Sequence, residues 1–204
     1  MSDPLKQKYI HQSIEELQRY IEAERFKGFD PYDTLTSTIP FHLLGKWGPI
    51  IATQIQKRNP FNIRKLIGIK KEYNPKGLGL LLHSYAILQQ KFPERTYKKQ
   101  LEELYKLILE KRTIGYSGTC WGYNFGWASP VKYLKPYAPT IVVTAFIAKG
   151  LFAYYKVSNK EEIKDLLLSI APFILKDLPH TITEDGVCIV IVHQCLTVVI
   201  MHPY

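Results

Sequence analysis

Four carboxylates in two irregular stretches are the residues best suited to chemistry. Asp30 and Asp33 lie three residues apart in GFDPYD, and Glu184 and Asp185 are adjacent in TEDG. Acid–base cleavage of a sugar bond uses two carboxyl groups, and one acid from each stretch would supply them. Both stretches also suit plain turns, because Asp–Pro starts turns and Gly186 can end one. The acids are therefore either catalytic candidates or turn residues.

The segment GTCWGYNFGWASP (118–130) brings aromatic rings together with glycines. Flat rings stack on the apolar faces of sugars, and Tyr hydroxyl and Trp N–H groups bond to sugar hydroxyls. An Asn amide both donates and accepts hydrogen bonds. We therefore predict a substrate platform that consists of Tyr32, Trp121, Tyr123, Asn124 and Trp127. The alternative is that Trp121, Phe125 and Trp127 fill the interior.

Metal and cofactor patterns are weak. The cysteines at 120, 188 and 195 lack CxxC spacing, and the histidines at 180, 193 and 202 have no ligand spacing. GLG at 77–79 lacks the rest of a dinucleotide-binding fingerprint, and the chain has no P-loop sequence. We expect no metal and no cofactor.

The chain has a formal net charge of +9. Seven basic residues and one acid, Glu72, lie between Lys57 and Lys76. This cluster is either a solvated surface or an anion-binding face for nucleic acid, acidic lipid or acidic polysaccharide. No nucleic-acid motif accompanies it, so we expect no nucleic-acid partner.

Targeting features are scarce. Three cysteines do not make a disulfide framework, which favours a reducing compartment. The N-terminal region has no apolar signal core, and no window contains eighteen uninterrupted apolar residues. We therefore expect a cytoplasmic protein without a membrane span.

Apolar residues recur at helical spacing in five segments, which must position these side chains. The first has Ile10, Ile14, Leu17 and Ile21 on one face and is expected to end near Gly28. The others are 76–92, 95–112, 140–157 and 158–178. Ser158 or Asn159 is the expected cap of the last one, and Pro172 should bend it or cut it short.

Short connections pair these helices into two antiparallel hairpins, each with an apolar first helix and a charged second helix. The repeat favours an all-α fold, a partial (α/α) toroid of hairpins around a central cleft. Long loops would then gather at one end of the barrel and line one pocket. A plain helical bundle is the alternative.

The motifs GFDPYDTLTS, CWGYNFGW and EDG together resemble a family of bacterial proteins associated with polysaccharide biosynthesis genes. The family carries GYDPYDGLNS, CWGY-aromatic-x-W and a late ED-G followed by SYSP and YNA. The resemblance covers about residues 28–187, with Thr34 and Thr36 where the family favours Gly and Asn. It implies a six-hairpin glycosidase-like (α/α) toroid and a setting in cell-surface polysaccharide production.

The tail departs from that family. Residues 188–204 read CIVIVHQCLTVVIMHPY, an apolar composition typical of β-strands. Codons for this tail, read two bases later, permit Ser-Tyr-Ser-Pro and then Tyr-Asn-Ala-Ser-Leu. We therefore expect an incomplete toroid domain over 1–187 and an out-of-frame tail over 188–204, with loss of any catalytic activity in this truncated form.

The sequence thus predicts a protein that binds or processes an oligosaccharide or polysaccharide. Hydrolase, lyase and epimerase chemistry all stay open. A non-catalytic helical scaffold or binding module in the same pathway is the second interpretation, and a basic anion-binding protein is the third.

Overall fold

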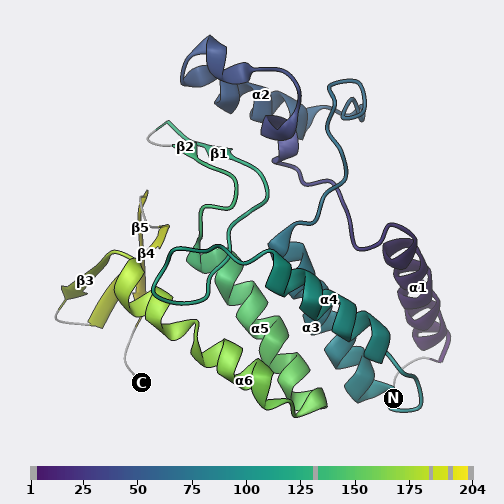
Figure 1. Cartoon of the computed structure of the whole chain (residues 1–204). Helices are drawn as coiled ribbons and strands as arrows, with labels where there is room; N and C mark the ends of the chain where they lie inside the picture. Colours follow the sequence, from purple (N-terminus) through teal and green to yellow (C-terminus); the bar gives the residue numbers. More distant parts are fainter. Residues whose placement is uncertain (1–3, 131–132, 184–185, 193–194, 202–204) are drawn as a thin grey trace.

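The computed structural model describes residues 4–130, 133–183, 186–192 and 195–201 and is mainly α-helical (Figure 1). Its α-helices are α1 (Pro4–Ala23), α2 (Trp47–Arg58), α3 (Pro75–Lys91), α4 (Lys98–Glu110), α5 (Ile141–Ser158) and α6 (Glu161–Leu168). Two short 3-10 helices, η1 (Asp33–Thr36) and η2 (Phe41–Leu44), precede α2. A mainly helical class is thus confirmed, whereas the partial toroid of hairpins is not confirmed and stays a prediction.

Two helical hairpins, α3–α4 and α5–α6, form the centre of the molecule (Figure 1). The apolar helices α3 and α5 pack directly on each other, at a contact where two glycines meet. A Cβ atom on Gly150 would lie 2.4 Å from the carbonyl oxygen of Gly79, so a larger residue would force the helices apart. The two expected hairpins, each with an apolar first helix and a charged second helix, are therefore present as α3–α4 and α5–α6.

One apolar core joins these four helices. Leu82 on α3, Leu104 on α4, Ile147 and Leu151 on α5, and Ile163 on α6 are all completely buried. The opposite face of α4 carries exposed charges, as the amphipathic spacing of its sequence predicts. Burial of these side chains is the main favourable free-energy contribution to this half of the fold.

Side-chain caps begin both apolar helices. The Asn74 side chain accepts a hydrogen bond from the Lys76 amide, and Pro75 occupies the first helical position of α3. The Thr140 hydroxyl accepts from the Val143 amide at the start of α5. These caps satisfy amide donors that have no partner within the helix.

The predicted cap of the last helix is wrong. Asn159 has a left-handed φ of 54° and closes α5, while Lys160 precedes α6 without a side-chain capping bond. α6 ends at Leu168, well short of residue 178, and a single π turn (Phe173–Asp177) follows Pro172. The expectation that Pro172 shortens this helix agrees with the structure.

The first helix also ends earlier than predicted. α1 stops at Ala23, where Arg25 and Phe26 adopt positive φ angles of 51° and 61°. Two non-glycine residues thus make the turn that we assigned to Gly28. The apolar face of α1 stays largely open, since Ile10 and Leu17 are at least half exposed.

Sequence periodicity assigned no element to residues 39–75, yet α2 forms there and packs on η1 and η2. This helix reverses the usual pattern. It buries Pro49 and Thr53, whereas Trp47, Ile51 and Ile55 are 51%, 53% and 62% exposed. Apolar spacing misses such a helix because its buried face is made of small and polar residues.

Two small antiparallel sheets complete the described chain. β1 (Trp127–Ala128) pairs with β2 (Tyr133–Leu134), and their hairpin extends towards the part of the chain that contains α2 (Figure 1). β3 (His180–Thr183), β4 (Gly186–Val192) and β5 (Cys195–Met201) form a meander. The strand composition of the tail is thus confirmed; β4 crosses the predicted boundary at residue 187, and the reading-frame interpretation stays a prediction.

α5 is long and apolar enough, by length and composition, to cross a membrane. It packs against α3, α4 and α6 in the core, and the core helix of a globular protein passes the same test. This is weak evidence for a membrane span.

Candidate functional site

The first acidic motif forms a compact loop, residues 28–37, which we name the acidic loop. Backbone hydrogen bonds in both directions between Gly28 and Glu72 hold its start against the segment that leads into α3. Its end turns into η1, where the Thr36 hydroxyl donates to the Asp33 carbonyl oxygen. The loop is therefore fixed at both ends by hydrogen bonds.

Asp33 is a structural carboxylate in this loop. It is 5% exposed and accepts hydrogen bonds from the Arg64 Nε at 3.0 and 3.2 Å and from the Asp30 amide at 3.0 Å. The same guanidinium donates to the Asp30 carbonyl oxygen at 3.2 Å. Because its oxygens hold a cation and a backbone amide, Asp33 shapes the loop.

Asp30 holds a separate set of hydrogen bonds. Its Oδ1 accepts from the Tyr32 amide at 2.9 Å, and its Oδ2 accepts from the Asn74 side chain at 2.8 Å. Partial burial raises the pKa of Asp30; the negative charge of Asp33 adds to that rise, while the hydrogen bonds and Lys76 oppose it. The Asp30–Tyr32 bond is the turn bond of the plainer interpretation, so Asp30 closes a turn and also keeps a perturbed carboxyl group.

The segment 118–130, which we name the aromatic loop, places Tyr123 within electrostatic reach of this acid. Burial raises the pKa of the Tyr123 phenol, and the charge of Asp30 and the Tyr32 phenol raise it further. The Tyr32 hydroxyl also accepts a 2.7 Å hydrogen bond from Lys57 at the end of α2. Asp30 and Tyr32 are joined by a hydrogen bond, and Tyr123 interacts with both through charge.

A close backbone contact positions Tyr123. Gly122 pairs with Pro139, and a Cβ atom on this glycine would lie 2.1 Å from the Ala138 carbonyl oxygen. The Tyr123 carbonyl oxygen accepts from the Tyr137 amide, and its ring stacks on Phe125 with a centroid distance of 5.0 Å. The glycine in CWGY is therefore required for this approach of the two strands of the loop.

Trp121 is not part of an exposed platform. Its side chain is 0% exposed, and the indole nitrogen donates to the Ile108 carbonyl oxygen at 2.8 Å. The Trp121 backbone is held by Thr144 and Thr140 at the start of α5. Because burial leaves no ring face for a ligand, Trp121 and the buried Phe125 follow the interior alternative.

The two remaining platform residues are accessible to different degrees. Trp127 lies on β1 and is 37% exposed. Asn124 is partly buried, and its Oδ1 finds no donor among the residues that the structure describes. This Oδ1 is itself buried, so it is not open to a ligand in this arrangement of the loop.

A pocket of about 640 Å³ lies between the end of the acidic loop and the β1–β2 hairpin. Its lining includes Leu35, Phe41, His42 and Lys46 on one side and Tyr133 on the other. Its volume falls within the range of pockets that bind small ligands. The lining combines the rings of Phe41 and Tyr133 with the nitrogen-bearing side chains of His42 and Lys46. Leu35, which belongs to η1, ties this pocket to the end of the acidic loop.

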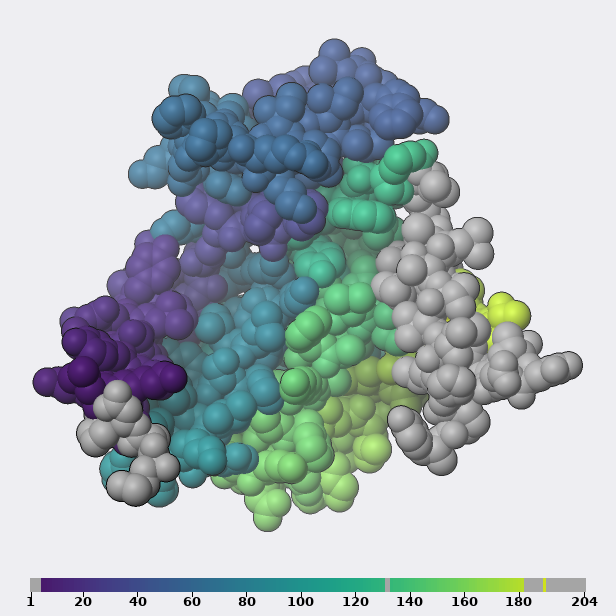
Figure 2. All heavy atoms as spheres, turned by 180° about the vertical axis from the view of Figure 1, so that it is seen from behind, coloured from purple at the N-terminus to yellow at the C-terminus, as the bar shows by residue number. Residues whose placement is uncertain are grey.

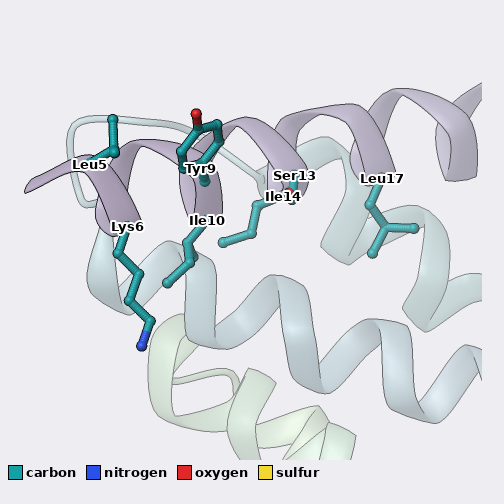
Figure 3. Close-up of a pocket in the computed structure, with 7 residues that line it drawn as sticks. All are labelled: Leu5, Lys6, Tyr9, Ile10, Ser13, Ile14 and Leu17. Atoms are coloured by element: carbon teal, nitrogen blue, oxygen red, sulfur yellow. The ribbon is translucent and has the colours of Figure 1, made fainter. Parts of the chain in front are cut away.

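A second hollow, of about 520 Å³, follows α1 and has a different character (Figure 3). Ile10, Ile14 and Leu17 project to the same side of the helix, and the lining is almost wholly apolar with a single charge, on Lys6. No carboxylate lines it. This surface suits packing against another apolar surface and not acid–base chemistry.

The second acidic pair, Glu184 and Asp185, lies outside the described residues, so its distance from Asp30 is not defined. Burial raises the pKa of the Cys120 thiol to about 12, which makes it an inert core thiol. Among the described residues, no group of three or more His, Cys, Asp or Glu side chains could hold a metal ion.

Sequence reasoning missed the residues that anchor Asp30. Asn74 and Pro75 carried a usable signal, since Asn–Pro before an apolar run is a typical helix start. Arg64 belonged to the basic cluster, but its partner Asp33 is 31 positions away, and spacing alone does not reveal such a pair.

Comparisons with models of protein families, with curated proteins and with solved structures find no match to this chain.

Proposed function

We propose that this protein binds or processes a carbohydrate in cell-surface polysaccharide production, with Asp30 at the centre of the site. The observation that carries the proposal is the partly buried Asp30 carboxyl, which accepts a hydrogen bond from Asn74 and lies within electrostatic reach of Tyr123. Phenol hydroxyls and rings next to a carboxyl group are the groups that sugars engage. The resemblance of GFDPYD and CWGY supplies the pathway.

Asp30 has two possible roles towards a sugar. Its raised pKa keeps a proton to higher pH than an ordinary Asp, which suits donation to a leaving oxygen. Ionised, the same group accepts hydrogen bonds from sugar hydroxyls. Tyr32 and Tyr123 would orient the ring.

A non-catalytic binding module is the second candidate, and one observation favours it. Arg64 engages both oxygens of Asp33, and both oxygens of Asp30 already accept hydrogen bonds from Tyr32 and Asn74. Hydrolysis of a glycosidic bond by the usual route needs two carboxyl groups that are available to the substrate.

Turnover and binding separate these candidates. The full chain is incubated with a panel of neutral and acidic oligosaccharides, and products are identified by mass spectrometry, while binding is followed by calorimetry. Turnover that disappears in Asp30→Asn supports the enzyme, and binding without turnover supports the module. If the protein neither binds nor turns over any oligosaccharide in the panel, the carbohydrate proposal is refuted.

A further inference from the structure

The segment from Thr34 to Lys71 forms a separate lobe at one end of the molecule, seen in blue at the top of Figure 2; we name it the cationic lobe. It contains η2, α2 and the turns that follow. No Asp or Glu occurs anywhere in these residues. Seven cations do: Lys46, Lys57, Arg58, Arg64, Lys65, Lys70 and Lys71. Most of the chain's net charge of +9 therefore resides in this lobe.

Most of these cations have no acidic partner, although Lys57 donates to the Tyr32 hydroxyl and Arg58 to the Gln54 side chain. Arg64 is paired with Asp33 and Lys71 with Glu24. The other five are exposed and form no ion pair with any residue in the described ranges. The lobe thus keeps a positive field that its own fold does not neutralise.

The same lobe presents large apolar side chains to the solvent. Trp47, Ile51 and Ile55 follow one another at four-residue spacing, so they share one face of α2. A shallow open groove of about 680 Å³ runs along this face. Before and after the helix, Leu43 and Leu44 are 75% and 72% exposed, and Phe61 and Leu66 are 75% and 86% exposed. Exposed apolar side chains at this density mark an interaction surface.

We propose that the cationic lobe docks on the surface of an anionic lipid bilayer. A helix that carries Trp and Ile on one face, bordered by Lys and Arg, inserts its apolar face at the headgroup boundary while its cations meet lipid phosphates. A nucleic acid or acidic polysaccharide would use the charges and leave the aliphatic side chains in water. A protein interface is depleted of charge at its core. The bilayer surface accepts both features together.

The lobe's anchoring to the rest of the protein fits this role. Lys57 at the end of α2 donates to Tyr32 of the acidic loop, and Pro49 and Thr53 face inwards. Docking would therefore use the outer face of α2 and leave its inner contacts in place.

Vesicle binding by the full chain tests the proposal. Flotation compares phosphatidylcholine vesicles with vesicles that also contain phosphatidylglycerol, at low and high salt. We expect binding to the anionic vesicles, weakened by salt because the charges are screened. The emission of Trp47 should shift to the blue on binding, and this shift should be absent in Trp47→Phe.

Two variants and two matched controls locate the surface. Lys65→Glu should weaken vesicle binding about tenfold, since it replaces an attraction with a repulsion. Ile55→Ser should weaken it about tenfold through lost apolar burial. Lys106→Glu on α4 and Leu168→Ser on α6 change equally exposed residues elsewhere and should leave binding unchanged.

Three results would overturn the inference. These are equal binding to neutral and anionic vesicles, equal loss in the control variants, and no vesicle binding at all. In the third case, loss of binding to an acidic polysaccharide or a protein in Lys65→Glu would assign the lobe to that partner.

Discussion

The helical core, α3–α6, and the cationic lobe use the same apolar residue types in opposite ways. In the core, Ile147 and Leu151 of α5 are completely buried against α3. In the lobe, Ile51 and Ile55 of α2 are more than half exposed, while the buried face holds Pro49 and a hydrogen-bonded Thr53. The comparison shows that apolar content alone does not fix which face of a helix packs. The acidic loop lies between the two regions, tied to the lobe by Arg64 and to the core by Asn74.

The largest expected effect belongs to the core. Trp121→Ala removes a completely buried ring and its bond to Ile108, and should lower the free energy of unfolding by about 4 kcal/mol. Trp127→Ala, at a 37% exposed ring, should cost less than about 1 kcal/mol. Denaturant unfolding measures both. Equal small losses would show that Trp121 is not a core residue.

The helix contact at Gly150 gives the next effect. Gly150→Ala places a Cβ atom 2.4 Å from the Gly79 carbonyl oxygen and should cost about 3 kcal/mol. The matched control is Gly77→Ala on α3, where the nearest side-chain atom would lie at an ordinary 3.6 Å. That control should be neutral or stabilising by up to about 1 kcal/mol. Similar thermal unfolding of both variants would refute close packing of α3 on α5.

The ion pair between loop and lobe comes third. Asp33→Asn leaves the Arg64 guanidinium without its counter-charge, and should cost about 2 kcal/mol. Glu15→Gln breaks the Arg95 pair on the surface, where both side chains are about half exposed, and should cost less than about 0.5 kcal/mol. Chemical denaturation ranks the two. A reversed order would mean that the lobe is not held by Asp33.

A smaller effect depends on pH. Burial raises the pKa of Asp30, so the folded protein holds this proton more tightly than the unfolded chain. Stability from this group is present below its ordinary pKa of 3.8 and is lost as pH rises through the raised folded value. The stability of the wild type relative to Asp30→Asn should therefore fall as pH rises above 3.8. A flat difference would place Asp30 in an unperturbed setting.

The smallest effect tests the lobe itself. Ile55→Ser should change the free energy of unfolding by no more than about 0.5 kcal/mol, because Ile55 is 62% exposed. Leu82→Ala in the core, which removes a completely buried side chain, is the contrasting variant and should cost about 3 kcal/mol. A comparable loss in Ile55→Ser would mean that the outer face of α2 is packed.

Apolar spacing in the sequence predicted helices best where the apolar face of the helix is also its buried face. α3 begins at Pro75 and α5 at Ile141, each within one residue of the predicted starts at 76 and 140. Apolar spacing did not predict α2, because the buried residues of this helix are small or polar. The end of α1 was predicted too late in the chain, because Arg25 and Phe26 adopt left-handed φ angles that their residue types rarely favour.

The candidate site was predictable in part. Asp30, Tyr32 and Tyr123 were proposed from residue type, and in the structure Tyr123 lies within electrostatic reach of the other two. Trp121 was proposed for the same reason, but it is buried. Residue type alone does not separate these two cases, because aromatic rings pack in a core as well as against a ligand. The anchors Arg64 and Asn74 depend on contacts over more than thirty positions, which no local pattern encodes.

The most direct measurement of the central claim is a calorimetric titration of oligosaccharides into the wild type, Asp30→Asn and Lys106→Glu, each checked for an unchanged fold. The account predicts saturable binding to the wild type and to Lys106→Glu, with affinity at least about tenfold lower in Asp30→Asn because a charged hydrogen-bond acceptor is lost. Equal affinity in all three proteins, or no binding by any of them, would contradict a carbohydrate site centred on Asp30.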